Sequence, residues 1–125
     1  MSNTVFVYGT LKHGYINHCV IKGSRFICDG ITDKPYLLLG LGLPFMVNES
    51  NDFNSVRVSG EVYDVSDETL ESLDILEGHP NLYKRESIWV INKNTGEKLY
   101  VFAYFINDGF ITPDRCNIIK DGIWR

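Results

Sequence analysis

A glutamate in an unfavourable helical position is the first residue of this sequence that points to chemistry. The sequence predicts a helix that begins after Ser66, a suitable N-cap, and ends at Glu77. Its apolar stripe consists of Leu70, Leu73 and Leu76. The glutamate falls inside this stripe and at the negative end of the helix dipole, so we expect an inward-pointing carboxylate whose charge is disfavoured. Such a residue is a candidate for function, although a frayed last turn that exposes it to water is an open alternative.

A glycine-containing loop after the first predicted strand is the second candidate. Residues 4–8 form a β-rich run that stops at Gly9, in the order Tyr8-Gly9-Thr10-Leu11. Glycine lets the backbone turn and aim successive N–H groups at one point, where they can hold an anion or a developing oxyanion. A strand that ends in glycine is more often a simple turn, so the loop alone does not establish a site. Its spacing fits neither a P-loop nor a dinucleotide-binding fingerprint, and no nucleotide cofactor is indicated.

The elements that must position these groups are mostly short strands. Residues 56–65 alternate between two faces, which predicts a half-buried strand. Residues 88–91 and 99–106 are β-branched and aromatic runs separated by the turn-forming residues 92–97, which predicts an antiparallel pair. Glycine and proline punctuate several shorter elements, namely extended pieces over residues 25–28 and 36–39 and a short helix over residues 17–22. This order favours a strongly curved or closed sheet with helices packed outside it.

Composition limits the classes of function. The chain has 125 residues, of which 44% are hydrophobic and 22% charged, and we expect one domain over residues 1–125. A net charge of -4 disfavours nucleic acid and anionic membranes as partners, and no apolar run approaches the roughly 20 residues that span a bilayer. No secretory signal follows Met1, so we expect a cytoplasmic protein. Without any CxxC motif, Cys19, Cys28 and Cys116 predict reduced thiols rather than a disulfide framework or a zinc ribbon.

Several motifs occur in a fixed order along residues 4–105. In chain order they are Tyr8-Gly9-Thr10-Leu11-Lys12, Gly60-Glu61-Val62-Tyr63, Leu73-Asp74, and the group Glu77, Pro80, Tyr83 and Arg85. This combination resembles the γ-glutamylcyclotransferase-like superfamily, and most closely its short members, the γ-glutamylamine cyclotransferases. The resemblance implies an α+β fold class, a small mixed β-barrel with flanking helices.

The resemblance also implies an enzyme that cleaves a γ-glutamyl amide without a cofactor or metal. The α-amino group of the substrate would attack its own γ-carbonyl and release 5-oxoproline and a free amine. By resemblance, the loop Tyr8-Gly9-Thr10-Leu11 would bind the glutamyl moiety, and Glu77 would be the catalytic acid/base. Tyr83 is a candidate contributor to substrate binding, although packing at the start of a strand explains it equally well. An ordinary glutamate has a pKa near 4.3, which makes it a weak base towards an α-amino group with a pKa near 8. Burial would raise the pKa of the glutamate and so reduce the difference between the two pKa values.

Several alternatives stay open from the sequence. The same fold can be catalytically silent and bind or sequester a small polar ligand, because fold does not guarantee activity. His13, His18 and Cys19 have the chemistry of metal ligands, but their spacing matches no common site, and His18 is better explained as a hydrogen-bonding residue near the loop. Asp74, at the edge of the helical stripe, is given no functional role. The leaving amine is also open among γ-glutamyl-ε-lysine, another γ-glutamylamine and a γ-glutamyl peptide.

Overall fold

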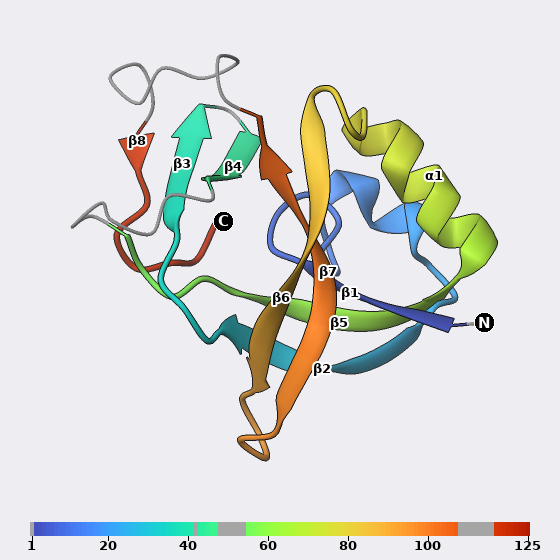
Figure 1. The fold of residues 1–125 in the computed structure, drawn as a ribbon, viewed down its shortest axis with the longest axis horizontal. Coiled ribbons are helices and arrows are strands. Elements are labelled where there is room, and N and C mark those ends of the chain that lie inside the picture. The colour runs from blue at the N-terminus through green and yellow to red at the C-terminus, as the bar shows by residue number, and fades with distance from the viewer. Residues whose placement is uncertain (1, 42, 48–54, 108–116) are drawn as a thin grey trace.

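A closed barrel of five strands is the centre of the fold (Figure 1). The computed structural model describes residues 2–41, 43–47, 55–107 and 117–125. Within these residues, the strands follow one another around the barrel in the order β1 (Ser2–Val7), β5 (Ser59–Ser66), β2 (Arg25–Thr32), β6 (Tyr83–Asn92) and β7 (Lys98–Ile106). Neighbouring strands are antiparallel except at the closure, where β7 pairs in parallel with β1 at Val5 and Phe102.

A small sheet and two helices flank the barrel. The sheet has the strand order β4 (Leu43–Val47), β3 (Leu37–Leu41) and β8 (Asn117–Ile118). The 3₁₀ helix η1 (Ile16–Val20) and the helix α1 (Asp67–Glu77) contact each other, and α1 lies across the barrel from the small sheet (Figure 1). The structure therefore confirms the predicted mixed α+β barrel with flanking helices. Neither helix in the described part of the chain has the length and apolar character that crossing a bilayer requires.

The predicted strands are present with different boundaries. The predicted antiparallel pair is the hairpin β6–β7, but β6 begins at Tyr83, because residues 83–87 also pair with β7. The strand predicted over residues 56–65 is found as β5, which begins at Ser59, whereas Val56 forms an isolated bridge with Tyr36. These differences arise because a strand extends as far as it pairs with its neighbour, and the residue pattern within one segment does not show where that pairing begins or ends.

Two layers of apolar side chains position the first strand. The alternation along β1, continued by the residue that follows it, sends Phe6 and Tyr8 into the core inside the barrel. Val5 and Val7 point to the other face, where they pack in a second core with Leu70 and Leu73 of α1 and with residues of η1 and the neighbouring strands. The loop after β1 therefore emerges between the interior of the barrel and the helices.

The helix α1 begins and ends at residues with recognisable capping chemistry. The side chain of Ser66 accepts a hydrogen bond from the N–H of Thr69, as expected for an N-cap. At the other end Gly78 adopts a left-handed conformation with φ of 66°, and its N–H donates to carbonyls of the last turn. Leu70 is buried as predicted, but Leu76, expected in the buried stripe, is 41% exposed because it lies at the rim of a cavity. The helix therefore ends at Glu77 without fraying.

Candidate active site

A cavity of about 250 Å³ opens between the end of β1, the end of α1 and the start of β6. It is lined by all six residues to which the sequence and the family resemblance assign a catalytic or binding role, namely Tyr8, Gly9, Thr10, Leu11, Glu77 and Tyr83. Further lining residues come from β4 and β7, so the cavity depends on segments that are far apart in the sequence. The fold thus brings the two separate candidates, the glycine loop and the glutamate, to one place.

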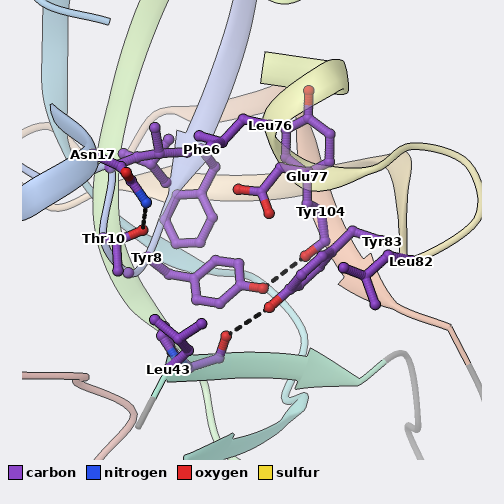
Figure 2. A pocket seen from close by; sticks show the side chains of 14 residues that line it. Phe6, Tyr8, Thr10, Asn17, Leu43, Leu76, Glu77, Leu82, Tyr83 and Tyr104 are labelled. Atoms are coloured by element: carbon purple, nitrogen blue, oxygen red, sulfur yellow. Dashed lines mark hydrogen bonds between the residues drawn. The ribbon is translucent and has the colours of Figure 1, made fainter. Parts of the chain in front are cut away.

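The Glu77 side chain points into this cavity. In Figure 2 its carboxylate extends towards the rings of Phe6 and Tyr8, which confirms the expected inward direction. No hydrogen bond or ion pair to this carboxylate is found among the described residues. Burial raises the pKa of Glu77 from 4.5 to about 7, so the carboxyl exchanges its proton near neutral pH.

Three tyrosines, Tyr8, Tyr83 and Tyr104, line the cavity with the glutamate, and each donates its hydroxyl proton to another acceptor, which for Tyr104 is the carboxylate of Asp74. Tyr8 donates to the carbonyl of Tyr104 over 2.8 Å and accepts from the N–H of Met46, which holds its ring as a wall of the cavity. Tyr83 donates to the carbonyl of Pro44 over 3.1 Å (Figure 2). Burial, reinforced by the charge of the nearby glutamate, raises the pKa of Tyr8 and of Tyr83, so both phenols stay protonated.

The glycine loop is tied down through its carbonyl groups and its threonine hydroxyl. Thr10 accepts from the backbone N–H of Asn17 through its carbonyl and from the side-chain amide of Asn17 through its hydroxyl, at 2.9 and 2.8 Å. The carbonyl of Leu11 lies 3.0 Å from Nδ1 of His18, which is the hydrogen-bonding role expected for that histidine. No partner for the N–H groups of residues 9–11 is found in the described part of the chain. The loop can therefore offer donors to an anion or an oxyanion in the cavity.

Gly9 is required by close packing against the small sheet. A Cβ atom at this position would lie 2.4 Å from Cγ of Pro44, which is closer than atoms can approach. Pro44 belongs to β4, and it also lines the cavity and accepts the hydrogen bond of Tyr83. Gly9 therefore sets the distance between the loop and the wall of the cavity formed by β4.

Sequence reasoning missed a second carboxylate close to the site. Asp74, which was given no function, accepts from the hydroxyl of Tyr104 and from Nη1 of Arg85, both at 2.7 Å. Tyr104 itself lines the cavity. The sequence does show that Asp74 and Glu77 lie three residues apart on one predicted helix, which makes them neighbours. No local pattern predicts that Asp74 pairs with residues of β6 and β7.

The charged and metal-binding chemistry of the site is limited. Glu77 is the only Asp, Glu, Lys or Arg among the described residues that line the cavity. The rings of His13 and His18 contact each other, but the described residues contain no group of three or more His, Cys, Asp or Glu side chains arranged to hold a metal ion. Cys19 and Cys28 are not joined in a disulfide, and Cys116 lies outside the described residues.

The raised pKa of Glu77 predicts that stability depends on pH. Because its pKa rises from 4.5 to about 7 on folding, the folded protein keeps this proton to a higher pH than the unfolded chain does. The contribution of Glu77 to the free energy of unfolding therefore falls as the pH rises from about 4.5 to about 7. We expect Glu77→Gln to raise the free energy of unfolding at pH 8 by up to about 3 kcal/mol and to change it little at pH 4. Urea denaturation at both pH values measures this, and an equal change at both would contradict it.

Comparisons with known proteins show the family to which the chain belongs. Residues 5–125 match the model of the family described as gamma-glutamyl cyclotransferase, AIG2-like. The chain is 35% identical over 118 residues to a Methanocaldococcus jannaschii protein provisionally named as a gamma-glutamylcyclotransferase, covering 94% of this chain and 90% of that one. It is 39% identical over 102 residues to gamma-glutamylaminecyclotransferase C of Danio rerio, covering 74% of this chain and 66% of that one.

Comparison of the fold with solved structures also finds an AIG2-like protein. The crystal structure of an AIG2-like protein from Mus musculus superposes with a TM-score of 0.86 at 25% sequence identity, covering 99% of this chain and 88% of that one. The family match spans residues 5–125 and therefore includes every residue that lines the cavity described above. The chain therefore belongs to the gamma-glutamyl cyclotransferase, AIG2-like family and is an enzyme of the cyclotransferase type.

Proposed function

We propose that the protein is a γ-glutamylamine cyclotransferase that converts a γ-glutamyl amide into 5-oxoproline and a free amine, with Glu77 as general acid and base. One observation carries the proposal. The half-buried carboxyl of Glu77 lines one cavity together with residues 9–11 of the glycine loop, and among the described residues no hydrogen bond is found to this carboxyl or from the N–H groups of that loop. The names of the relatives support the same class of reaction.

The proposed reaction uses the substrate's own nucleophile. Glu77 takes a proton from the α-ammonium group, and the freed amine attacks the γ-carbonyl carbon of the same molecule. A C–N bond forms, and the N–H groups of the loop from Gly9 to Leu11 stabilise the negative charge on the carbonyl oxygen. Glu77 returns its proton to the departing nitrogen as the original amide bond breaks. The ring nitrogen loses a second proton, which the basic product amine takes up.

The raised pKa of Glu77 suits both of its proton transfers. An α-amino group has a pKa near 8, so a carboxylate at 4.5 would be mismatched by roughly 3.5 units, whereas one at about 7 is mismatched by roughly one unit. This difference lowers the cost of the first proton transfer by about 3 kcal/mol. Because the attack is intramolecular, the protein mainly has to hold the glutamyl chain bent within the cavity.

The rim of the cavity favours an amine leaving group over a peptide. Leu43, Leu76 and Leu82 line the cavity and are 51%, 41% and 39% exposed, so they present aliphatic surface at its mouth. No lysine, arginine or histidine is found among the described lining residues to pair with a carboxylate on the leaving group. An aliphatic amine arm buries apolar area on this rim, whereas a leaving group that carries a carboxylate near the scissile bond loses water there without an ion pair.

A substrate panel scored by release of 5-oxoproline tests the proposal. We expect γ-glutamyl-n-butylamide and γ-glutamyl-ε-lysine to be turned over with kcat/KM about tenfold or more above that of γ-glutamylglycine. Leu76→Ala should raise KM for the butylamide, while Ile75→Ala is the matched control, because Ile75 lies on the same helix but outside the cavity and is 76% exposed. A preference for γ-glutamylglycine would contradict the role of the rim.

The alternative of a silent binding module makes a different prediction. If none of the three amides is turned over while 5-oxoproline binds in calorimetry, the protein binds a ligand and does not catalyse this reaction. The free α-amino group is essential in the proposed mechanism, so an N-acetylated γ-glutamyl amide serves as the negative control in the same assay. The expectation of a cytoplasmic protein stays a prediction.

A further inference from the structure

The carboxylate of Asp74 accepts hydrogen bonds from two donors, one of which, Tyr104, lines the cavity. Its Oδ1 accepts from the hydroxyl of Tyr104 and its Oδ2 accepts from Nη1 of Arg85, each at 2.7 Å. The side chains of Arg85 and Asp74 are both partly buried, with exposed fractions of 23% and 22%. The guanidinium of Arg85 also lies over the ring of Phe102 at 4.7 Å, so its position is fixed from two sides.

Asp74 and Glu77 lie on the same side of α1, three residues apart. Side chains at this spacing are neighbours on a helix, with Cβ atoms about 5–6 Å apart. The Asp74 carboxylate therefore accepts from both Tyr104 and Arg85, whereas no hydrogen bond to the Glu77 carboxylate is found among the described residues. Figure 2 shows the hydroxyl of Tyr104 directed away from the cavity into which the Glu77 carboxylate points.

Other titratable groups lie on the elements that pack against α1 or adjoin it, and each has a hydrogen-bond partner outside α1. Tyr8 donates to the carbonyl of Tyr104, Tyr63 donates to Glu61 and Tyr83 donates to the carbonyl of Pro44. A ring nitrogen of His18 bonds the carbonyl of Leu11, and His79 accepts from the N–H of Arg85. The side chains of Tyr104 on β7 and Arg85 on β6 instead donate to a residue of α1, the carboxylate of Asp74.

We propose that Asp74 is a positioning residue for Glu77, which it serves by holding the hydroxyl of Tyr104 and the guanidinium of Arg85 away from the Glu77 carboxylate. Without Asp74, these two donors would have Glu77 as the neighbouring carboxylate on the same face of the helix. A hydrogen bond from Tyr104 or a positive charge from Arg85 would favour ionised Glu77 and make it a weaker base. The proposal rests on the proposed function for its catalytic meaning, but its effect on Glu77 is measurable without turnover.

The test is the titration of Glu77, followed by ¹³C NMR of its side-chain carboxyl and assigned with Glu77→Gln. We expect Asp74→Ala to lower the pKa of Glu77 by about one unit or more. The triple variant Asp74→Ala/Arg85→Met/Tyr104→Phe, which lacks both released donors, should return the pKa to near that of the parent protein. Asp74→Asn keeps an acceptor for Tyr104 while losing the charge opposite Arg85, so it should give a smaller shift in a protein of nearly unchanged shape.

A merely structural role for Asp74 gives a different pattern. If loss of Asp74 only loosened the last turn and let Glu77 into water, its pKa would fall in Asp74→Ala and remain low in the triple variant, which would overturn the proposal. An unchanged pKa in both Asp74→Ala and Asp74→Asn would overturn it as well. Glu71→Ala, an exposed carboxylate removed from the same helix, is the matched control and should leave the titration unchanged.

Enzyme kinetics give a second readout on the same variants. We expect the acid limb of the kcat/KM profile to move to lower pH in Asp74→Ala by the shift seen in NMR, and to return in the triple variant. If the parent protein releases no 5-oxoproline from any amide, the proposed function fails while the NMR result for Asp74 still stands or falls by itself. A shifted NMR titration with an unmoved pH profile would overturn the link between Asp74 and catalysis.

Discussion

Replacement of Glu77 by glutamine is expected to lower the rate of 5-oxoproline release by about 10²–10⁴-fold. The amide has nearly the same shape as the carboxyl, but it can neither take the proton from the α-ammonium group nor return one to the leaving nitrogen. The cavity should remain intact, because among the described residues no hydrogen bond or ion pair of the Glu77 carboxyl holds α1 in place. Single-turnover and steady-state assays on γ-glutamyl-n-butylamide measure the loss, which we expect in kcat rather than in KM.

Binding separates loss of chemistry from loss of the site. Glu77→Gln should still bind 5-oxoproline in calorimetry, since the glycine loop and the tyrosine walls are unchanged. Glu71→Gln makes the same chemical change at an exposed position of α1 and should leave both turnover and binding as they are. Retention of more than about a tenth of the activity in Glu77→Gln would be incompatible with general acid–base catalysis by this residue.

Introduction of a methyl group at Gly9 is expected to cost both stability and activity. The new Cβ of Gly9→Ala would lie 2.4 Å from Cγ of Pro44, and the proline ring cannot rotate away as a flexible side chain would. Either the loop or β4 must move, at a cost of about 1–3 kcal/mol in the free energy of unfolding. A shift of the loop by about 1 Å moves its N–H groups from the oxyanion and should lower kcat/KM by about 10²-fold.

A compensating substitution tests whether the contact with Pro44 is the cause. Pro44→Ala removes the two closest atoms, Cγ and Cδ, and leaves Cβ at 3.6 Å and the carbonyl that accepts from Tyr83. The double variant Gly9→Ala/Pro44→Ala should therefore recover most of the lost stability. Gly40→Ala is the matched control in the neighbouring strand β3, because among the described residues its Cβ would meet only the flexible side chain of Ile119, at 3.3 Å from Cδ1. An absence of recovery in the double variant would refute the steric explanation.

Local signals in the sequence were sufficient to predict α1 and the direction of Glu77. Ser66 and Gly78 provide the chemistry of a helix start and a helix end, and both caps are found. A leucine stripe fixes which face of the helix is buried, and Leu73 is fully buried as expected. These features depend on residues within one helix, so a single segment of sequence contains the necessary information. The inward glutamate could be predicted because it violates that same local pattern.

The rest of the site depends on contacts between distant segments. Nothing near Asp74 in the sequence indicates that Arg85 and Tyr104 will lie against it, since that follows from the register of β6 with β7 and from the packing of α1. The carbonyl of Pro44 became the partner of Tyr83 only through the small sheet, whose strand β8 has two residues and no readable pattern. Leu76 was assigned to the core because the stripe does not reveal where the core ends and a cavity begins.

The parallel closure of the barrel affects how the protein acquires its cavity during folding. β1 carries the glycine loop near one end of the chain, whereas its neighbour β7 supplies Tyr104 near the other, so these walls meet only when the barrel closes. Such a topology has a high contact order, which places folding nearer the millisecond-to-second range of β-barrels than the microseconds of helical bundles. During synthesis on the ribosome, the nascent chain therefore has no working cavity until β7 has emerged and joined β1.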